Sequence, residues 1–498
     1  MSKNLVIVES PAKAKTIEKF LGPDYVVKSS IGHIRDMPKK DMGVDIENNF
    51  QPTYAISADK KKVVADLKKS VKTATKIFLA TDEDREGEAI AWHLQQALSL
   101  AEDTPRIVFH EITKGAITDA INNPRTIDTD LVNAQQARRI IDRLVGFEIS
   151  PVLWRKISGA RSAGRVQSPV VRIVVERERE ISAHNPTSSH KVKANLENSS
   201  NQSLEVKLSV DFKSKEEALS FAESVLSAEL KVSSVETKPS KRSPKAPFIT
   251  STLQQEASQK LGFSVKQTMS IAQNLYREGA ITYMRTDSLN LSELAITAAQ
   301  EVIVSKFGSE FHQTRRYKTN SSGAQEAHEA IRPTDLTKPS ILGLDDQSTK
   351  LYSLIYKRTL ASQMSDAQLQ KTKININISN RSEHFIADGE VLSFAGFLEV
   401  YDYMAAEDKL LPEVSKGDLL TLVDLASKES FSRAKPRYTE ASLVKEIEQM
   451  GIGRPSTFAT MITTVQDRNY VVKETREGVQ RDYQLIEIED GVISESIQ

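Results

Sequence analysis

The sequence contains no cysteine, which excludes disulfide bonds and zinc sites built on thiolates. This absence is typical of proteins that work in a reducing cytoplasm. Long apolar runs are also missing: the longest, such as residues 5–8, are far shorter than the roughly 20 residues of a membrane-spanning helix. The first residues lack the layout of a signal peptide. We therefore expect a cytoplasmic protein with no membrane partner.

Neither sign of charge is in excess, since 67 Lys and Arg balance 67 Asp and Glu. This balance does not exclude a nucleic-acid partner, because binding needs only a local basic surface. One basic segment exists: ten Lys or Arg lie between Arg138 and Arg179, several of them at helical spacing. A solvated helix face with pairs such as Arg138 and Asp142 explains this spacing slightly better. The pattern alone leaves both interpretations open.

The chain of 498 residues is too long for a single core, so we expect several domains. Its first part alternates strands and helices. Residues 5–8 and 77–80 are predicted strands, each followed by a helix, and this order predicts a parallel α/β sheet. In such sheets, ligands bind beyond the carboxyl ends of the strands. Glu9 and the acidic residues 82–86 both lie just past such an end.

The rest of the chain divides by pattern. Residues 130–182 are predicted to be helical, whereas residues 187–245 and 366–430 alternate apolar and polar side chains as strands do. We expect these two similar segments to form one β-rich domain, interrupted by a helical insertion that carries Tyr283. The Pro-, Lys- and Ser-rich span 238–245 marks the crossing into the insertion. The predicted units are 1–130 with an inserted segment at about 37–70, helical 131–186, β-rich 187–248, helical 249–365, β-rich 366–439 and helical 440–498.

Acidic residues alternate directly after the second predicted strand, as Asp82, Asp84 and Glu86. In an extended segment, residues two apart point to the same side, so Asp82 and Asp84 can converge on one cation. Magnesium prefers oxygen ligands and is often shared with phosphate. An acidic run is usually a solvated surface, but its place at a strand end beside Glu9 gives a magnesium site equal weight.

Tyr283 stands two residues before Arg285 in Ile281-Thr282-Tyr283-Met284-Arg285-Thr286-Asp287-Ser288. A phenol can attack a phosphodiester and hold the broken end as an ester, provided that a cation sits on the phosphate. Arg285 lies on the same side in an extended segment and offers a fork of donors. A strand end running into a polar turn is the plain alternative. A phosphotyrosine bond would allow resealing without ATP, and the chain has no Gly-x-x-x-x-Gly-Lys-Ser/Thr loop.

Three further segments carry candidate groups. Glu9 and Lys13 lie four residues apart near a helix start, where they could protonate a leaving hydroxyl and neutralise a phosphoryl oxygen. A capping carboxylate beside a surface lysine is the simpler interpretation of this pair. Residues 451–457 combine two glycines with a helix start, which suits a phosphate-binding turn or a plain loop. His328 lies in a helical pattern, where a structural histidine is the more common case.

Taken together, these motifs resemble the type IA DNA topoisomerases, in the family's order and over nearly the whole chain. Met284 favours the bacterial topoisomerase I branch, because the topoisomerase III branch usually has proline there. The matching segments are Val8-Glu9-Ser10-Pro11-Ala12-Lys13, Ser30-Ile31-Gly32-His33, Thr81-Asp82-Glu83-Asp84-Arg85-Glu86-Gly87-Glu88, Gln135-Gln136-Ala137-Arg138-Arg139, Ser162-Ala163-Gly164-Arg165-Val166-Gln167-Ser168, Ala246-Pro247-Phe248-Ile249-Thr250-Ser251, Tyr283 to Ser288, and residues 324–333 and 451–456.

The resemblance implies an N-terminal TOPRIM α/β domain, with helical and β-rich domains arranged as a toroid around a DNA-sized hole. In the family, segments such as 131–186 and 440–498 form a DNA-binding domain, and 187–248 and 366–439 form a hinge domain. Tyr283 would attack single-stranded DNA, keep the 5′-phosphate and free a 3′-hydroxyl, which would relax negatively supercoiled DNA once a strand is passed and the break resealed. The implied partner is therefore single-stranded and negatively supercoiled DNA, bound by a monomer at the bacterial nucleoid.

The resemblance also implies a role for each matching residue. Glu9 would be the general acid, and Lys13 and Arg285 would stabilise the phosphate. Mg²⁺, needed chiefly for religation and relaxation, would be held by Glu9, Asp82, Asp84 and Glu86. DNA-binding roles would fall on His33, Arg138, Asp142, Arg165, Gln167, His328, Arg332, Arg454 and Ser456.

In the family, the chain continues past the segment that ends here at Gln498, so the resemblance implies a C-terminally truncated or unusually short member, with 440–498 an incomplete domain. Two alternatives remain open. One is a member that binds and cleaves single-stranded DNA but does not complete relaxation. The other is a different TOPRIM enzyme, such as a primase or nuclease, which would lack a nucleophile of the Tyr283 type.

Overall fold

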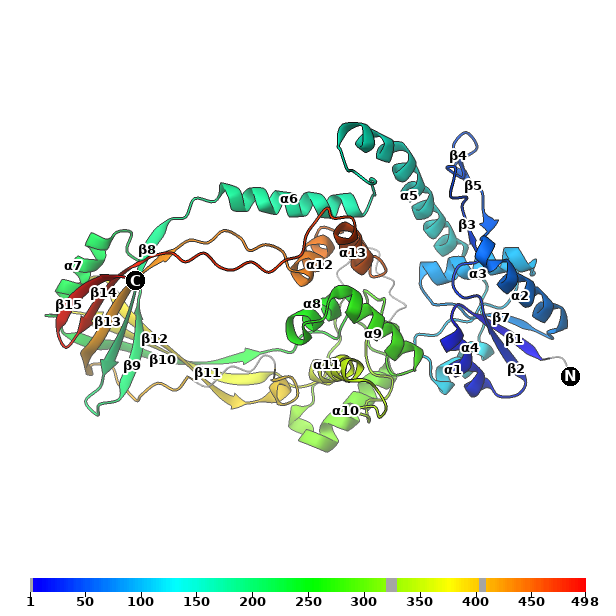
Figure 1. Ribbon diagram of the computed structural model, residues 1–498. Helices are drawn as coiled ribbons and strands as arrows, with labels where there is room; N and C mark the ends of the chain where they lie inside the picture. Colours follow the sequence, from blue (N-terminus) through cyan, green and yellow to red (C-terminus); the bar gives the residue numbers. More distant parts are fainter. Residues whose placement is uncertain (1–2, 319–328, 403–408) are drawn as a thin grey trace.

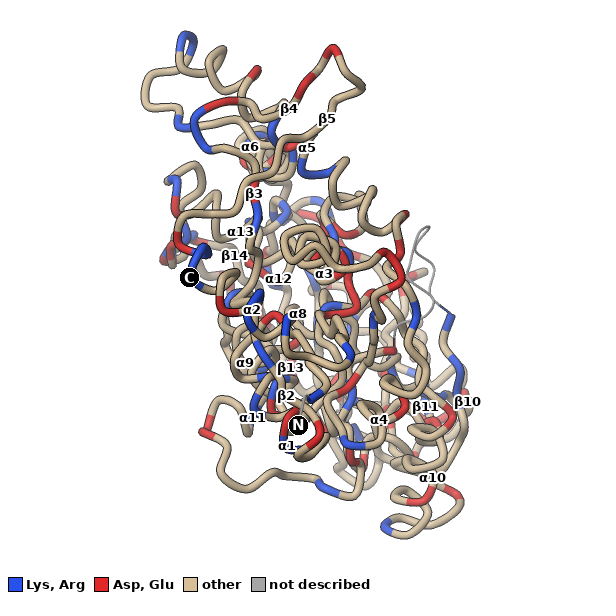
Figure 2. The backbone as a smooth tube through the Cα atoms, turned by 90° about the vertical axis from the view of Figure 1, so that its right-hand side faces the viewer, with Lys and Arg blue, Asp and Glu red and all other residues tan. Residues whose placement is uncertain are grey.

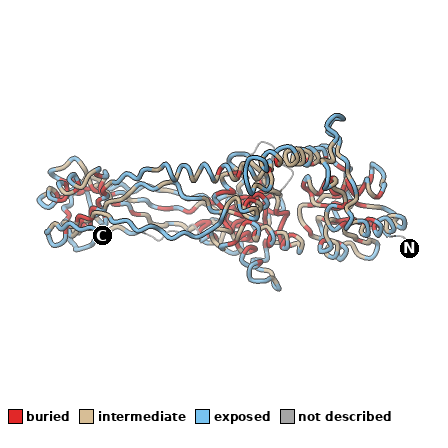
Figure 3. The backbone as a smooth tube through the Cα atoms, turned by 45° about the horizontal axis from the view of Figure 1, so that its top comes forward, coloured by how far each residue is buried: buried red, intermediate tan, exposed pale blue. Residues whose placement is uncertain are grey.

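The computed structural model describes residues 3–318, 329–402 and 409–498 (Figure 1). Its elements form an elongated molecule, with the N-terminal α/β part at one end and a large β-sheet at the other. Buried residues gather at these two ends and in the helices between them, while the connecting arms are largely exposed (Figure 3). Among the residues described, no helix combines the length and the apolar character that crossing a membrane requires.

The N-terminal part contains three parallel strands in the order β2-β1-β7. Leu5 and Ile7 of β1 pack towards α2 and α3, and Val6 and Val8 pack towards α1 and α4, because successive side chains of a strand point to opposite faces. Its elements are β1 (Asn4–Val8), α1 (Pro11–Leu21), β2 (Tyr25–Ser29), β3 (Arg35–Asp36), β4 (Val44–Asp45), β5 (Gln51–Pro52), β6 (Ala55–Ile56), α2 (Lys61–Thr73), β7 (Ile77–Leu79), α3 (Arg85–Leu98) and α4 (Lys114–Asn122).

A second part, here called the tyrosine part, packs against the N-terminal sheet. Val6 and Val8 lie in the same apolar cluster as Leu275, Tyr283 and Met284. The two parts therefore share one core, and Tyr283 lies where they meet. The helices of the tyrosine part are α8 (Thr250–Leu261), α9 (Val265–Arg277), α10 (Glu293–Phe307) and α11 (Asp346–Ser362).

Eight strands form one large sheet in the order β10-β11-β12-β9-β8-β13-β14-β15, and β10 also pairs with β13. The strand-rich segments before and after the tyrosine part pair directly in it, because β10 is antiparallel to β11. Helix α7 (Lys215–Val225) packs Phe221 into the core of this sheet. The strands are β8 (Ser188–Glu197), β9 (Ser203–Leu208), β10 (Leu230–Arg242), β11 (Ala367–Ile378), β12 (His384–Phe394), β13 (Leu419–Phe431), β14 (Gln484–Glu489) and β15 (Val492–Ile497).

Three helices form a helical part: α6 (Gln167–Ala183), α12 (Glu440–Gln449) and α13 (Phe458–Asp467). Helix α5 (Thr129–Lys156), which precedes α6, packs against α3 of the N-terminal part. Val170 of α6 packs with Phe458 and Met461 of α13, and Val265 of the tyrosine part joins the same cluster. One arm connects the helical part to the sheet, and a second arm, built from β10 and β11, connects the sheet to the tyrosine part (Figure 1). The elements thus follow a ring, in agreement with the toroid that the resemblance implies.

Two expectations from the sequence are wrong. Residues 440–498 are not helical throughout, because β14 and β15 extend the sheet; Ile486 and Ile488 alternate with glutamates and are fully buried there, a strand pattern. The span 238–245 is not a crossing segment throughout, because β10 continues to Arg242 with Pro239 opposite Gln370. Pro239 is tolerated because, among the described residues, β13 pairs with β10 only at Leu230 and Lys231, so no second strand needs the missing N–H at position 239.

Candidate active site

Two loops at one edge of the N-terminal sheet hold the candidate groups. Glu9 directly follows β1, and Asp82 lies shortly after β7. Because β1 and β7 are parallel neighbours, their carboxyl ends meet at this edge. Ser10 then caps α1 by accepting a hydrogen bond from the backbone N–H of Lys13 at 3.3 Å, which fixes the start of the helix and directs the Lys13 side chain to the same edge.

Lys13 is the centre of the first cluster, with only 1% of the residue exposed. Its ammonium forms ion pairs with Glu9 at 2.7 Å and with Asp82. Burial disfavours the charged lysine, but Asp82 and Glu9 still raise the pKa of Lys13 well above its ordinary value. Burial and the charge of Asp82 raise the pKa of Glu9, against the influence of Lys13. Glu9 is therefore the carboxyl group of this cluster that is best suited to carry a proton.

Tyr283 and Arg285 meet at Asp84 in a second cluster. The Tyr283 hydroxyl donates a hydrogen bond to Asp84 Oδ2 at 2.7 Å, and Arg285 lies 3.6 Å from the same oxygen. Burial, together with the charges of Asp82 and Asp84, raises the pKa of Tyr283 well above its ordinary value. The phenol is therefore neutral, and its proton points at a carboxylate that can accept it. The backbone N–H of Tyr283 donates to the carbonyl of His110 at 2.9 Å, which joins the tyrosine part to the N-terminal part.

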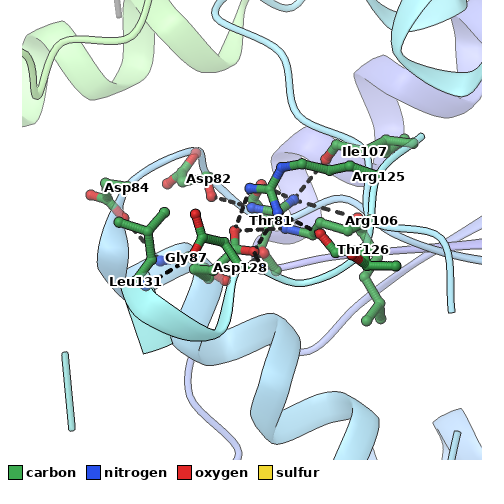
Figure 4. Close-up of polar contacts among 12 residues, drawn as sticks. Thr81, Asp82, Asp84, Gly87, Arg106, Ile107, Arg125, Thr126, Asp128 and Leu131 are labelled. Carbon is green, nitrogen blue, oxygen red and sulfur yellow. Dashed lines mark hydrogen bonds and ion pairs between the residues drawn. The ribbon is translucent and has the colours of Figure 1, made fainter. Parts of the chain in front are cut away.

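Arg106 holds the backbone of the acidic loop that follows β7 in place (Figure 4). This arginine is fully buried and donates hydrogen bonds to the backbone carbonyls of Thr81 at 2.8 Å, Asp82 at 2.6 Å and Ile107 at 2.6 Å. Its Nε also pairs with the buried Glu88 at 3.1 Å. Because the backbone of the loop is fastened in this way, the carboxylates after β7 are held in a defined direction.

Gly87 lets the same loop pack against the first turn of α3. A Cβ atom at this position would lie 2.1 Å from the backbone oxygen of Asp82. Asp84 caps α3 by accepting the Gly87 N–H at 2.9 Å. The loop and the helix start are thus a single packed unit, and only glycine fits at this position.

The four predicted magnesium ligands do not all converge. Glu86 is directed to Gln135 at 3.1 Å and His33 at 3.5 Å, away from the other carboxylates. Within the described ranges, no group of three or more His, Asp or Glu is arranged to hold a metal ion. The donors nevertheless fit Mg²⁺ in kind, because Glu9 and Asp82 are neighbouring carboxylates and the second oxygen of Glu9 is buried without a hydrogen-bond partner. Lys13 supplies the positive charge between them.

Several predicted DNA-binding residues line two cavities beside the active site. One, of about 500 Å³, is lined by arginines from α3, α5 and the loops before α6 and α13: Arg85, Arg138, Arg165 and Arg454. The other, of about 300 Å³, is lined by His33, Glu86, Arg138 and Asp142, among others. Asp142 and Arg165 form an ion pair at 3.0 Å. Basic and acidic positions are interspersed along the chain (Figure 2).

The remaining predicted DNA-binding residues are placed differently. Gln167 donates a hydrogen bond to the carbonyl of Ser162 at 3.3 Å, and Ser456 is half-buried in the loop before α13. Arg332 is buried and paired with Glu329 at 2.5 Å and Glu111 at 3.0 Å. Because Glu111 belongs to the N-terminal part, this arginine connects the two parts that meet at Tyr283. His328 lies outside the described residues.

The sequence did not reveal Arg106 or Tyr276 as members of the site. Arg106 directly precedes a short apolar run, and a lone charge beside such a run was the only signal. Tyr276 lies on the buried face of the amphipathic helix α9, where an aromatic core residue is the ordinary interpretation.

Comparison with known proteins identifies the family. A profile described as "DNA topoisomerase" matches residues 126–483, and one described as "Toprim domain" matches residues 4–112. The chain is 45% identical to the DNA topoisomerase 1 of Streptomyces coelicolor, covering 95% of this chain and 56% of that protein. It is also 45% identical to the enzyme of the same name from Salmonella typhimurium, covering 96% and 60%, and to that from Campylobacter jejuni, covering 97% and 71%.

A solved structure, the full-length topoisomerase I of Thermotoga maritima, superposes with a TM-score of 0.85 at 40% identity. The match covers 94% of this chain and 79% of that one. The chain thus spans 56–60% of the Streptomyces and Salmonella relatives. With its Toprim sheet, its ring of elements and its matching profile, the chain belongs to the type IA family of bacterial DNA topoisomerases.

Proposed function

We propose that this protein breaks one strand of DNA, passes a second strand through the break and reseals it without ATP, which relaxes negatively supercoiled DNA. The observation that carries this proposal is the contact of the Tyr283 hydroxyl with Asp84 beside Arg285, next to the cluster of Glu9, Lys13 and Asp82. It supplies a nucleophile, a proton acceptor, a proton donor and two cations at one place.

Each group has one task in the cleavage step. The Tyr283 oxygen attacks phosphorus while its proton passes to Asp84, and the bond from phosphorus to the 3′-oxygen breaks. Glu9 gives its proton to that 3′-oxygen. The 5′-phosphate then remains on Tyr283, and Lys13 and Arg285 stabilise the charge on its oxygens. Resealing is the reverse of these steps, so the energy of the broken bond is kept in the phosphotyrosine ester.

Magnesium is part of the proposal. Glu9, Asp82 and Asp84 would hold it at the edge of the Toprim sheet, with Glu86 joining only if it leaves Gln135 and His33. When bound, the ion would supply positive charge beside the DNA phosphate. The four carboxylates remain a proposed ligand set, and the Toprim domain, a fold that binds metal ions, supports it.

Single-stranded DNA would reach the site along the arginine-lined cavity of Arg85, Arg138, Arg165 and Arg454. Tyr283 is only 1% exposed, so DNA gains access when the tyrosine part moves away from the Toprim domain. We infer a monomer, because all the groups named for cleavage come from one chain. Because its proposed substrate is DNA, we propose that the protein works in the cytoplasm, at the nucleoid.

Plasmid relaxation tests the complete reaction. Purified protein with Mg²⁺ and no ATP is expected to convert negatively supercoiled plasmid to relaxed topoisomers, and Tyr283→Phe is expected to leave it supercoiled. Tyr356→Phe, a buried tyrosine of α11 whose hydroxyl donates to the carbonyl of Leu336, serves as the matched control. Cleavage of single-stranded DNA without any change in supercoiling would instead support the alternative in which the chain cuts but does not relax DNA. The relatives, all named DNA topoisomerase 1, favour the complete reaction.

A further inference from the structure

A second tyrosine lies against the nucleophile. Tyr276, on α9, is 1% exposed, and its ring meets the Tyr283 ring edge to face, with centroids 5.1 Å apart. The ammonium of Lys13 lies 4.9 Å from the centroid of the Tyr276 ring, which is within range of a cation–π interaction. Tyr276 therefore contacts both Tyr283, the proposed nucleophile, and Lys13, which is proposed to stabilise the phosphate.

The hydroxyl of Tyr276 is the unusual feature. Five tyrosines are buried in the described part of the chain, and only Tyr276 has no hydrogen-bond partner for its hydroxyl there. The others donate to a carboxylate or a backbone carbonyl: Tyr283, Tyr352, Tyr356 and Tyr401. A buried hydroxyl without a partner destabilises the fold, so a structural role alone does not explain why a tyrosine rather than a phenylalanine is present.

The surroundings of this hydroxyl indicate what it binds. Burial raises the pKa of Tyr276, and its other electrostatic neighbours are Lys13, Asp82, Glu83 and Glu9, all at the active-site edge. The group is thus a neutral donor beside Lys13, the lysine that the proposed function assigns to the DNA phosphate. A phosphate oxygen is the acceptor that DNA would bring to this place.

We propose that Tyr276 is a further catalytic residue, whose hydroxyl donates a hydrogen bond to a non-bridging oxygen of the DNA phosphate that Tyr283 attacks. The face of its ring holds the ammonium of Lys13, and the hydroxyl gains its missing partner when DNA binds. No bond is made or broken at Tyr276. The inference rests on the proposed cleavage function and adds a second donor to it.

The substitution Tyr276→Phe separates the hydroxyl from the ring. It keeps the contacts with Tyr283 and Lys13 and removes only the unpaired group. We expect its thermal unfolding temperature to be equal to or above that of the parent, while its rate constant for cleavage of a saturating single-stranded oligonucleotide falls roughly 10- to 100-fold. Tyr352→Phe is the matched control with the opposite pattern, because the Tyr352 hydroxyl donates to the carbonyl of Lys338 at 2.7 Å. That variant is expected to unfold at a lower temperature and cleave at the parental rate.

A modified substrate gives a second readout. An oligonucleotide with sulfur in place of one non-bridging oxygen at the cleavage site is expected to slow the parent more than Tyr276→Phe, for one of the two stereoisomers. Equal slowing of both proteins by both stereoisomers would overturn the proposed contact, as would a parental cleavage rate in Tyr276→Phe. A lower unfolding temperature in that variant would mean that the hydroxyl is structural. If the parent itself forms no covalent adduct with DNA, the proposed function fails, which is a different result.

Discussion

At the scale of single residues, the active site is a balance of charges set by burial. Lys13 is charged between two carboxyl groups, and Tyr283 keeps its proton because burial and the acidic residues beside it raise its pKa. The proposed proton donor Glu9 and the proposed proton acceptor Asp84 are far apart in sequence, but both lie in loops that follow neighbouring strands.

Gly87 makes the packing of the acidic loop testable. Gly87→Ala places a Cβ 2.1 Å from the Asp82 oxygen, so the loop must shift. We expect a loss of roughly 1–3 kcal/mol in the free energy of unfolding of the Toprim domain, with slower DNA cleavage. Gly115→Ala, in α4, is the matched control: no atom lies within 4 Å of its added Cβ, and it is expected to gain about 0.5–1 kcal/mol. Urea unfolding of both variants measures this, and equal changes would contradict the packing described.

His93 gives the Toprim domain a defined sensitivity to acid. Burial and the charge of Arg35 lower its pKa from 6.5 to about 3. In the unfolded chain, His93 therefore binds a proton below about pH 6.5. In the folded chain, it stays neutral until the pH approaches 3. The stability from neutral His93 is present above that pH and is lost as pH falls towards 3. Between pH 7 and pH 5 the loss is about 2 kcal/mol.

The measurement uses a natural probe. Trp92 lies 4.8 Å from His93 between ring centroids, and the only other tryptophan in the sequence is Trp154. In a Trp154→Phe background, Trp92 fluorescence follows urea unfolding at pH 7 and pH 5. His93→Gln is expected to lose about 2 kcal/mol less than its parent over this interval. Identical losses would show that His93 is not buried in its neutral form.

At the scale of elements, the arginine-lined cavity is formed by α3, α5 and the loops before α6 and α13. Arg165→Ala is expected to weaken binding of single-stranded DNA severalfold and to lower the slope of log affinity against log salt by about 0.7. Arg172→Ala, in α6, is the control, because that arginine is highly exposed, lies outside the cavity and has one carboxylate partner, as Arg165 does. Equal slopes for the two variants would exclude Arg165 from the DNA path.

Elements whose signals are local could be predicted from the sequence, and contacts between distant segments could not. The alternation of strands and helices placed Glu9 and Asp82 at one sheet edge, because parallel strands impose that geometry. The ion pairs of Lys13 with both carboxylates, and the hydrogen bond of Arg106 to the Asp82 carbonyl, join distant segments of the chain. No periodic pattern in the sequence predicts such contacts. Residues 484–497 alternate as strands do, but the helical pattern that precedes them in the sequence obscures this local signal.

At the scale of the whole molecule, the ring of elements is closed by contacts between its parts. Tyr283 is buried between the tyrosine part and the Toprim domain, and Ser251 of α8 donates a hydrogen bond to Glu448 of α12, which joins the tyrosine part to the helical part. The proposed passage of a DNA strand through the ring requires these contacts to separate. The arms to the large sheet are exposed and carry few buried residues (Figure 3), so the ring can open while its units stay folded.

A reversible cross-link tests this opening. The natural chain has no cysteine, so Ser251→Cys with Glu448→Cys introduces only two. Joining them with a short linker that contains a disulfide is expected to abolish plasmid relaxation, and reductant is expected to restore it. Each single variant treated with the same reagent should remain active. Relaxation at the parental rate by the cross-linked protein would contradict a gate between α8 and α12.

Identifying the residue that becomes covalently bonded to DNA is the most direct test of the central claim, that Tyr283 is the nucleophile. Single-stranded oligonucleotide is trapped on the protein by denaturation, the adduct is digested with trypsin and nuclease, and the modified peptide is sequenced by mass spectrometry. We predict a 5′-nucleotide phosphate on Tyr283, and no adduct with Tyr283→Phe. A phosphate on any other residue, Tyr276 included, or an undiminished adduct with Tyr283→Phe, would contradict the assignment of Tyr283 as the nucleophile.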